Sequence, residues 1–228
     1  MKVVLKVGGH LFPEVPALAA IAAYGAMLRD LQGLGHRVVV VTGGGRVART
    51  YIEAARGLGA SEVACDQLGI EVSRLNARLV IATMGEAAYP EPVTTLSQLV
   101  TAFASHKGVV VGGLQPGQST NAVGILAAEA VHADLLLNAT DVDGVYTADP
   151  AEDALARKLT VVRTDELLRL LLAKELWAGS YALFDPVAIK LVERSRIPTR
   201  IIDGRDPATV VAAVQGAAVG TLIVSAAP

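Results

Sequence analysis

The stretch Val109–Glu129 constrains the fold more than any other part of the sequence. A short run of β-branched residues, Val109–Val111, precedes a glycine-rich loop, Gly112–Ser119, and an alanine-rich pattern that begins at Thr120. The run predicts a buried strand, and the alanine-rich pattern predicts a helix with Ser119 or Thr120 as its N-cap. Such a loop is typical of an anion site, because backbone amides and the positive end of the helix dipole meet there. An ordinary strand-to-helix connection gives the same pattern, so this motif alone leaves both interpretations open.

Three more loops of this kind follow short apolar runs that predict strands. These runs are Lys2–Val7, Val38–Val41 and Ala133–Ala139. The loops that follow them are Gly8–Gly9, Gly43–Gly45 and the acidic loop Thr140–Pro150. Further short strands are expected at Leu159–Val162, Arg200–Ile202 and Leu222–Val224.

Predicted helices alternate with these strands from end to end. They are Pro16–Leu34, Arg46–Arg56, Glu62–Gly85, Leu96–Ser105, Thr164–Ala173, Pro186–Ser195 and Pro207–Gln215. Ser61 and Asp185 are expected as N-caps, and Pro16 and Pro186 as first helical residues. The alternation predicts an α/β fold, a three-layer αβα sandwich with a mainly parallel open sheet. Ligands of such sheets sit at the carboxyl ends of the strands, where the four loops would gather.

Composition narrows the class of protein. Hydrophobic residues make up 52% of the 228 residues and charged residues 18%, which is typical of a globular chain. The net charge of −2 predicts no broad basic face, so we expect no nucleic-acid partner. The single cysteine, Cys65, excludes an internal disulfide and fits a reducing compartment. No secretory signal or membrane-spanning run is evident, so a cytoplasmic protein of one domain (residues 1–228) is expected, with approximate lobes 1–132 and 133–228.

One motif favours a different class of protein. Gly43–Ala48 matches the G-x-G-x-x-A pattern of dinucleotide-binding folds, and Asp66 follows at the spacing of the ribose-binding acid. In those folds the acid ends a second strand, whereas Asp66 lies in a predicted helix. The first glycine loop of the chain, Gly8–Gly9, is also of another type. A dehydrogenase is therefore disfavoured.

Several glycine loops with isolated cations predict a ligand that carries more than one phosphate cluster. A kinase that acts on a phosphorylated acceptor must align two anions and neutralise their charge. Lys6 ends the first strand on the same face as Lys2 and Val4, so it is either a phosphate ligand or an edge lysine that reaches solvent. Arg49 is either a phosphate ligand or a solvated helix residue, and Arg46 competes with it for this role.

The acidic side chains also leave alternatives open. Asp66 can accept both hydroxyl groups of a ribose, or it is an exposed helix acid. The acids of Thr140–Pro150 can hold Mg²⁺, orient Lys6 or form local Asx turns, and Tyr146 can stack near a base. Arg74 and Asn76 are either ligands or helix-packing and interface residues. The four histidines are scattered, so no protein metal site is firmly predicted.

Five segments together resemble the amino acid kinase superfamily and, within it, the archaeal-type uridylate (UMP) kinases. They are TGGGRVARTYIEAA at Thr42–Ala55, DQLGIEVSRLNARL at Asp66–Leu79, GGLQPGQSTNAVGILAAE at Gly112–Glu129, TDVDGVYTADP at Thr140–Pro150 and AGSYALFDPVAIKLVERSRI at Ala178–Ile197. The resemblance covers nearly the whole chain.

The resemblance implies transfer of the ATP γ-phosphoryl group to UMP, with Mg²⁺ accompanying ATP. It implies catalytic roles for Lys6 and for Asp143, which would orient Lys6. Implied UMP contacts are Gly44, Asp66, Leu114, Gln115, Pro116, Gly117, Gln118, Ser119 and Thr120. Implied ATP contacts are Gly9, His10, Gly45, Arg49, Thr140, Tyr146 and Asp149. It further implies a homo-oligomer, a hexamer, with UTP as an inhibitor. The lobe 1–132 would hold UMP and the lobe 133–228 ATP.

The sequence departs from related patterns at three places. His10 stands where relatives often carry Ser or Lys, which puts one phosphate contact in doubt. Asp185 stands where other kinases of the superfamily have a second lysine, so Lys190 is not assumed to be catalytic. Isopentenyl phosphate kinases carry a histidine after the second glycine loop, where this chain has Arg49-Thr50. The alternatives are a kinase of the same fold for another small phosphate or carboxylate, and a non-catalytic nucleotide or oxyanion binder.

Overall fold

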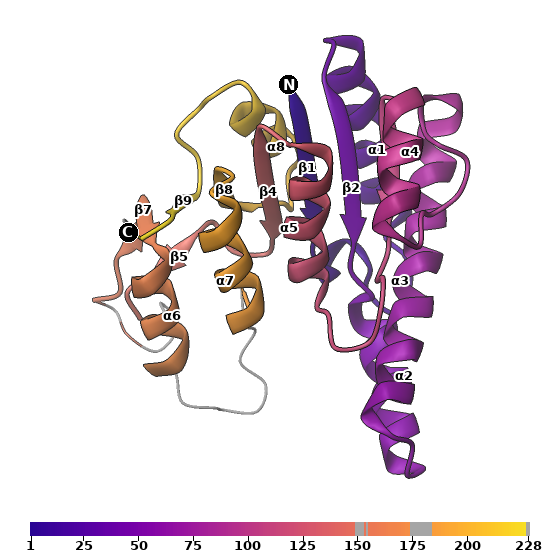
Figure 1. Ribbon diagram of the computed structural model, residues 1–228, viewed down its shortest axis with the longest axis horizontal. Coiled ribbons are helices and arrows are strands. Elements are labelled where there is room, and N and C mark those ends of the chain that lie inside the picture. Colours follow the sequence, from indigo (N-terminus) through magenta and orange to yellow (C-terminus); the bar gives the residue numbers. More distant parts are fainter. Residues whose placement is uncertain (149–152, 154, 174–183, 227–228) are drawn as a thin grey trace.

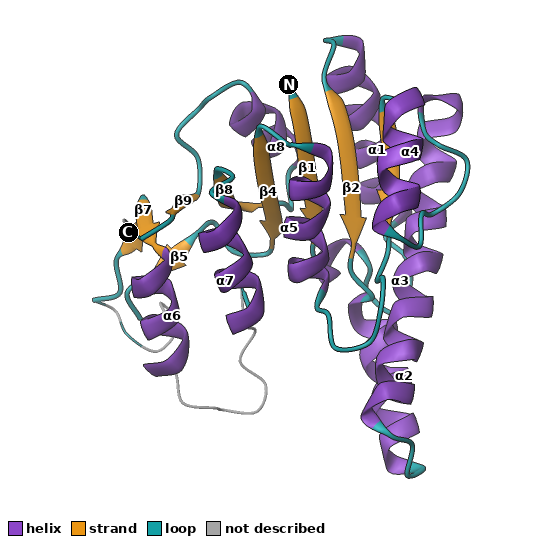
Figure 2. Ribbon diagram, viewed as in Figure 1, coloured by secondary structure: helices purple, strands orange, loops and turns teal. Residues whose placement is uncertain are grey.

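A seven-stranded sheet lies between two layers of helices (Figures 1 and 2). The computed structural model describes residues 1–148, 153, 155–173 and 184–226. The strand order is β3-β2-β1-β4-β8-β9-β7. The five strands from β3 to β8 run parallel to one another, and β9 reverses direction against β8. The expected three-layer αβα sandwich with a mainly parallel sheet is confirmed.

The strands of the main sheet are short and largely buried. In sheet order they are β3 (Gly108–Val111), β2 (Arg37–Thr42), β1 (Lys2–Val7), β4 (Leu135–Thr140), β8 (Thr199–Asp203), β9 (Thr221–Val224) and β7 (Val161–Arg163). A second, two-stranded sheet pairs β5 (Val145–Tyr146) with β6 (Lys158–Leu159).

The helices divide between the two faces of the main sheet. One face carries α1 (Leu18–Gly33), α3 (Glu62–Met84) and α8 (Pro207–Val214). The other carries α4 (Leu96–Ser105), α5 (Thr120–Val131), α6 (Thr164–Ala173) and α7 (Pro186–Ser195). The helix α2 (Gly45–Gly57) packs on α3 and extends with it beyond the sheet (Figure 1). The 3₁₀ turns η1 (Gly9–Leu11) and η2 (Gly85–Ala87) lie between the longer elements.

Successive side chains of β1 point to opposite faces of the sheet and pack in two different cores. Val3, Leu5 and Val7 pack with α1, α3 and α8. Val4 packs in the core on the opposite side, beneath α5. Lys6 lies on that side too, because its Cβ is 3.6 Å from the position that a Cβ on Gly124 of α5 would occupy. The expectation that Lys6 shares a face with Val4 is therefore confirmed.

Most predicted elements are confirmed, with three corrections. Pro16 is not the first residue of α1, because Ala17 is the N-cap and the helix begins at Leu18. The predicted strand Leu159–Val162 is two strands, since Leu159 pairs with Val145 in the small sheet and Val162 with Ile223 in the main sheet. The acidic loop contains the strand β5. None of the described helices is both long and apolar enough to span a membrane.

Candidate functional site

A cavity of about 270 Å³ lies at the carboxyl ends of β1, β2 and β3, bordered by α2 and α3. Nine residues predicted from the sequence line it: Lys6, Gly9, Gly44, Gly45, Arg49, Asp66, Gln115, Gln118 and Thr120. Its wall also contains Gly43 and Gly113 of the predicted loops, and five residues that were not predicted to take part: Ala48, Ile52, Gly69, Ile70 and Ser73. The structure therefore brings the first three predicted loops to one concave site.

The glycine loops after β1 and β2 touch each other at this cavity. A side chain at Gly45, which has a φ of +66°, would collide with the carbonyl oxygen of Phe12. That carbonyl accepts the Arg46 amide at 3.2 Å. A Cβ on Gly9 would be 3.1 Å from the Gly45 Cα and 3.7 Å from Nη2 of Arg49. Only glycine allows this approach, which brings the Arg49 guanidinium to the first loop.

Lys6 is a buried cation at the centre of the site. The residue is 7% exposed, and its ammonium group forms no ion pair with any residue that the structure describes. Burial lowers the pKa of Lys6 from its ordinary value of 10.5 to about 8, and the negative charge of Asp141 opposes this shift. A buried ammonium group without a carboxylate partner attracts an anionic ligand, because charge interactions are strong where water is excluded.

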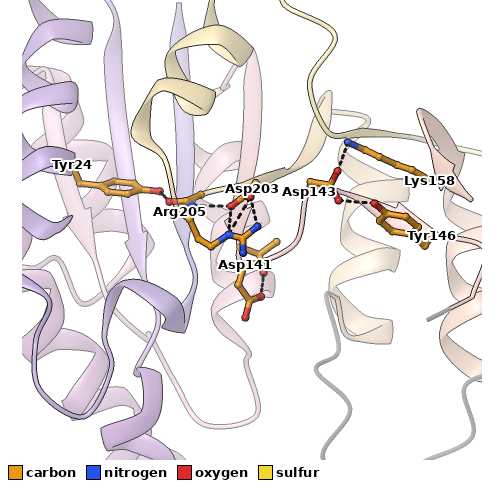
Figure 3. A network of polar contacts seen from close by, with 9 residues as sticks. Tyr24, Asp141, Asp143, Tyr146, Lys158, Asp203 and Arg205 are labelled. Carbon is orange, nitrogen blue, oxygen red and sulfur yellow. Dashed lines mark hydrogen bonds and ion pairs between the residues drawn. The ribbon is translucent and has the colours of Figure 1, made fainter. Parts of the chain in front are cut away.

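Asp143, which the sequence predicts to orient Lys6, contacts two other side chains in the structure. Its carboxylate accepts hydrogen bonds from Tyr146 Oη (2.9 Å) and Lys158 Nζ (3.0 Å), as Figure 3 shows. Burial raises the pKa of Asp143, but the bonds from Lys158 and Tyr146 outweigh it and keep that pKa below its usual range. Asp143 therefore serves the β5–β6 hairpin, and the acid whose charge acts on Lys6 is Asp141.

The helix α3 holds two loops of the cavity in place. Asn76 Nδ2 donates to the Gly43 carbonyl at 2.8 Å, and Ser73 Oγ accepts the Gly113 amide at 2.6 Å. The sequence left Asn76 as either a ligand or a packing or interface residue, and it did not single out Ser73. Its one signal was their spacing of three residues, which places them on one helix face.

Asp66 contacts the loop after β3 directly. One of its carboxylate oxygens accepts the amide of Gly117 at 2.8 Å. The side chain predicted to hold a ribose thus also fixes the position of the loop. Nearby, the buried amide oxygen of Gln118 has no hydrogen-bond partner among the described residues, so it is able to accept a bond from a ligand.

The remaining predicted residues lie around the cavity or away from it. Leu114, Pro116, Gly117 and Ser119 belong to the same loop as Gln115 but do not line the cavity itself. Thr140 is buried, and its hydroxyl donates to Asp141 at 3.1 Å. Tyr146 lies in the hairpin described above. Asp149 lies outside the described residues, as does the side chain of His10, whose backbone is in η1.

Within the ranges that the structure describes, no three His, Cys, Asp or Glu side chains are grouped to hold a metal ion. Mg²⁺ in kinase sites is commonly bound by substrate phosphates with only one or two carboxylates. Asp141 follows β4 directly, and its charge acts on the buried Lys6. The donor set therefore fits a cation that arrives with a nucleotide.

Comparison with known proteins gives a consistent result. The model of the amino acid kinase family matches residues 1–203. A uridylate kinase of Methanococcoides burtonii is 47% identical over 221 residues, covering 97% of this chain and 94% of that protein. One from Hyperthermus butylicus is 49% identical and covers 97% of both. The crystal structure of uridylate kinase from Archaeoglobus fulgidus has a TM-score of 0.87 and 38% identity, covering 98% of this chain and 100% of that one.

Proposed function

Because the chain belongs to the amino acid kinase family and matches uridylate kinases over nearly its whole length, we propose that it transfers the γ-phosphoryl group of ATP to UMP. The products are UDP and ADP. The observation that carries this proposal is the buried Lys6 ammonium group where the glycine loops after β1 and β2 meet. Phosphoryl transfer needs alignment and charge neutralisation rather than covalent chemistry from the protein.

Lys6 stabilises the negative charge of the moving phosphoryl group. It is pre-positioned on a central strand, so no reorganisation is needed when charge develops. The acceptor phosphate of UMP is already an anionic nucleophile, and no general base is required. Asp141 assists by favouring the charged form of Lys6.

The two substrates are assigned to the two sides of Lys6. UMP contacts Gly44, Asp66 and the loop from Leu114 to Thr120, with Asp66 on the ribose hydroxyls. ATP contacts Gly9, His10, Gly45, Arg49, Thr140, Tyr146 and Asp149. Support for the UMP side comes from the shared cavity and from the unpartnered amide oxygen of Gln118. Support for the ATP side comes from Arg49, which lies over the first glycine loop.

Mg²⁺ accompanies ATP and neutralises part of the phosphate charge when bound. Asp141 is the carboxylate that would accompany this cation, because its negative charge acts on Lys6. The chain is further proposed to act in the cytoplasm as a homohexamer that UTP inhibits, with a UMP lobe before Ala133 and an ATP lobe after it. The family resemblance supports these points.

The test is an ADP-release assay with Mg-ATP and a panel of acceptors. The panel contains UMP, CMP, AMP, isopentenyl phosphate and acetylglutamate. Turnover with UMP alone is the expected result. Turnover with another acceptor would keep the kinase fold and reject the uridylate assignment of Asp66 and the loop. ATP binding without turnover on any acceptor would favour a nucleotide-binding protein instead.

A further inference from the structure

The loop Gly112–Ser119 is fastened to α3 where it leaves β3. A Cβ on Gly112 would be 2.8 Å from the backbone nitrogen of Arg74, and one on Gly113 would be 2.8 Å from Cγ1 of Ile70. The two glycines therefore let the backbone of the loop lie directly against the helix. This contact is close enough for side chains of α3 to bind the main chain of the loop.

Arg74 binds two successive carbonyl groups of this loop. Its Nε donates to the Gly113 oxygen at 3.2 Å, and its Nη2 donates to the Leu114 oxygen at 3.3 Å. The third guanidinium nitrogen is 3.6 Å from the carboxylate of Glu71, and the Arg74 side chain is 23% exposed. Hydrogen bonds from a partly buried cation are stronger than neutral ones, and the planar guanidinium fixes the direction of both carbonyls.

The direction of these carbonyls sets the direction of the following amides. In a trans peptide the C=O and the next N–H point in opposite directions. The amides of Leu114 and Gln115 therefore point away from Arg74, and neither forms a hydrogen bond within the described part of the chain. Arg74 thus turns carbonyl oxygens, which would repel an anion, toward itself and leaves amide donors available.

We propose that Arg74 is a positioning residue for the acceptor nucleotide, a role that rests on the proposed binding of UMP by this loop. Arg74 does not line the cavity, so it acts through the backbone of Gly113 and Leu114. The ATP side is built from other loops. Loss of Arg74 should therefore weaken the binding of UMP and leave the binding of ATP nearly unchanged.

The experiment compares steady-state kinetics of the wild type with Arg74→Ala, Arg74→Lys and Arg78→Ala. Arg78 is the matched control, since it is an exposed arginine of α3 one turn further on. Arg74→Ala is expected to raise KM for UMP about tenfold or more and to change KM for ATP less than about twofold. Arg74→Lys should recover only part of this loss, because an ammonium group does not span two carbonyls. Arg78→Ala should match the wild type.

The outcomes separate this inference from the proposed function. A wild type without UMP turnover rejects the proposed function before any variant is compared. UMP turnover with equal kinetics for Arg74→Ala and Arg78→Ala overturns the role of Arg74. An equal rise of both KM values, with a lower melting temperature, makes Arg74 only a stabilising residue and also overturns it. If Arg74→Ala does not fold, Arg74→Lys decides by the same ratio of KM values.

Discussion

The hydroxyl group of Ser119 donates a hydrogen bond to the carboxylate of Asp185, and each residue also caps a helix. Ser119 Oγ accepts the Ala122 amide at the start of α5 (3.0 Å), and Asp185 accepts the Ala188 amide at the start of α7 (2.9 Å). The two helices pack side by side (Figure 1). The pair therefore joins the end of the loop Gly112–Ser119 to the C-terminal part of the chain.

Asp185→Ala should reduce both stability and activity. It removes a cap and the partner of Ser119, a loss of about 1–3 kcal/mol in the free energy of unfolding. Asp185→Asn keeps an oxygen for the cap and should lose less. The matched control is Asp206→Ala, since Asp206 caps α8 through the Ala208 amide, away from the cavity. Urea unfolding should show a loss in both alanine variants, whereas KM for UMP should rise only for Asp185→Ala. Equal KM values would show that the Ser119–Asp185 bond has no role in the site.

Element boundaries with local chemical signals were predictable from the sequence. Ser61 and Asp185 were expected as N-caps, and Ser119 was one of two candidates with Thr120. Each of Ser61, Ser119 and Asp185 accepts an amide of its own helix. Such caps depend on residues three positions apart, so the sequence contains all the information. Pro16 shows the limit, because a proline is acceptable both at and before a helix start.

Contacts between distant segments could not be derived in this way. Arg74 meets the loop after β3 across 40 residues, and Asn76 meets Gly43 across 33. Only the packing of α3 beside the strand ends brings these groups together. The partner of Asp143 could not be predicted for a similar reason, since Lys158 lies on another strand. In an irregular loop the side chains follow no fixed period, so the sequence does not show in which direction each one points.

Lys6→Met should stabilise the protein while abolishing turnover. The folded pKa of Lys6, about 8, lies below its ordinary value of 10.5, so burial of the charged form destabilises the fold. At about 1.4 kcal/mol per pKa unit, this cost is roughly 3 kcal/mol at neutral pH. Methionine has a similar length and no charge to bury. Lys2→Met is the control, since Lys2 is on the same strand face and donates to the Val131 carbonyl instead.

The pH dependence of this stabilisation has a definite sign. Below about pH 8 Lys6 is protonated in both states, and the full cost is present. Between pH 8 and 10.5 the folded protein loses its proton first, so the cost disappears as the pH rises. The stability advantage of Lys6→Met in denaturant unfolding should therefore be larger at pH 7 than near pH 9.5. An advantage that grows with pH would contradict the burial of a charged Lys6.

Asp141→Asn and Asp143→Asn should differ in their pH profiles. The proposed catalysis requires charged Lys6, so kcat/KM should fall as the pH rises through the pKa of Lys6 in the free enzyme. The charge of Asp141 raises that pKa, and its removal should move the fall to lower pH. Asp143 pairs with Lys158 and Tyr146, so Asp143→Asn should leave the position of the fall unchanged. The reverse pattern would restore Asp143 as the acid that orients Lys6.

A pair of substrates can separate the observed role of Asp66 in the loop from its proposed role at the ribose. Its carboxylate holds the Gly117 amide, and we propose that it also accepts the ribose hydroxyls of UMP. Asp66→Asn keeps one accepting oxygen for Gly117 but loses an acceptor for the ribose. It should therefore raise KM for UMP about tenfold with a smaller change in kcat, whereas Asp66→Ala should raise KM further because the loop also loses its anchor.

Deoxyuridylate, which lacks one ribose hydroxyl, tests the ribose contact alone. The wild type should prefer UMP over deoxyuridylate. Asp66→Asn should lose most of this preference, since one of the two oxygens that accept the ribose hydroxyls is then replaced. Glu62→Gln is the control, because Glu62 lies on the same helix and pairs with Arg56 away from the cavity. If Asp66→Asn raises both KM values by the same factor, the carboxylate acts on the loop and not on the ribose. The tenfold loss would then belong to the Gly117 contact, and the ribose would be bound elsewhere in the cavity.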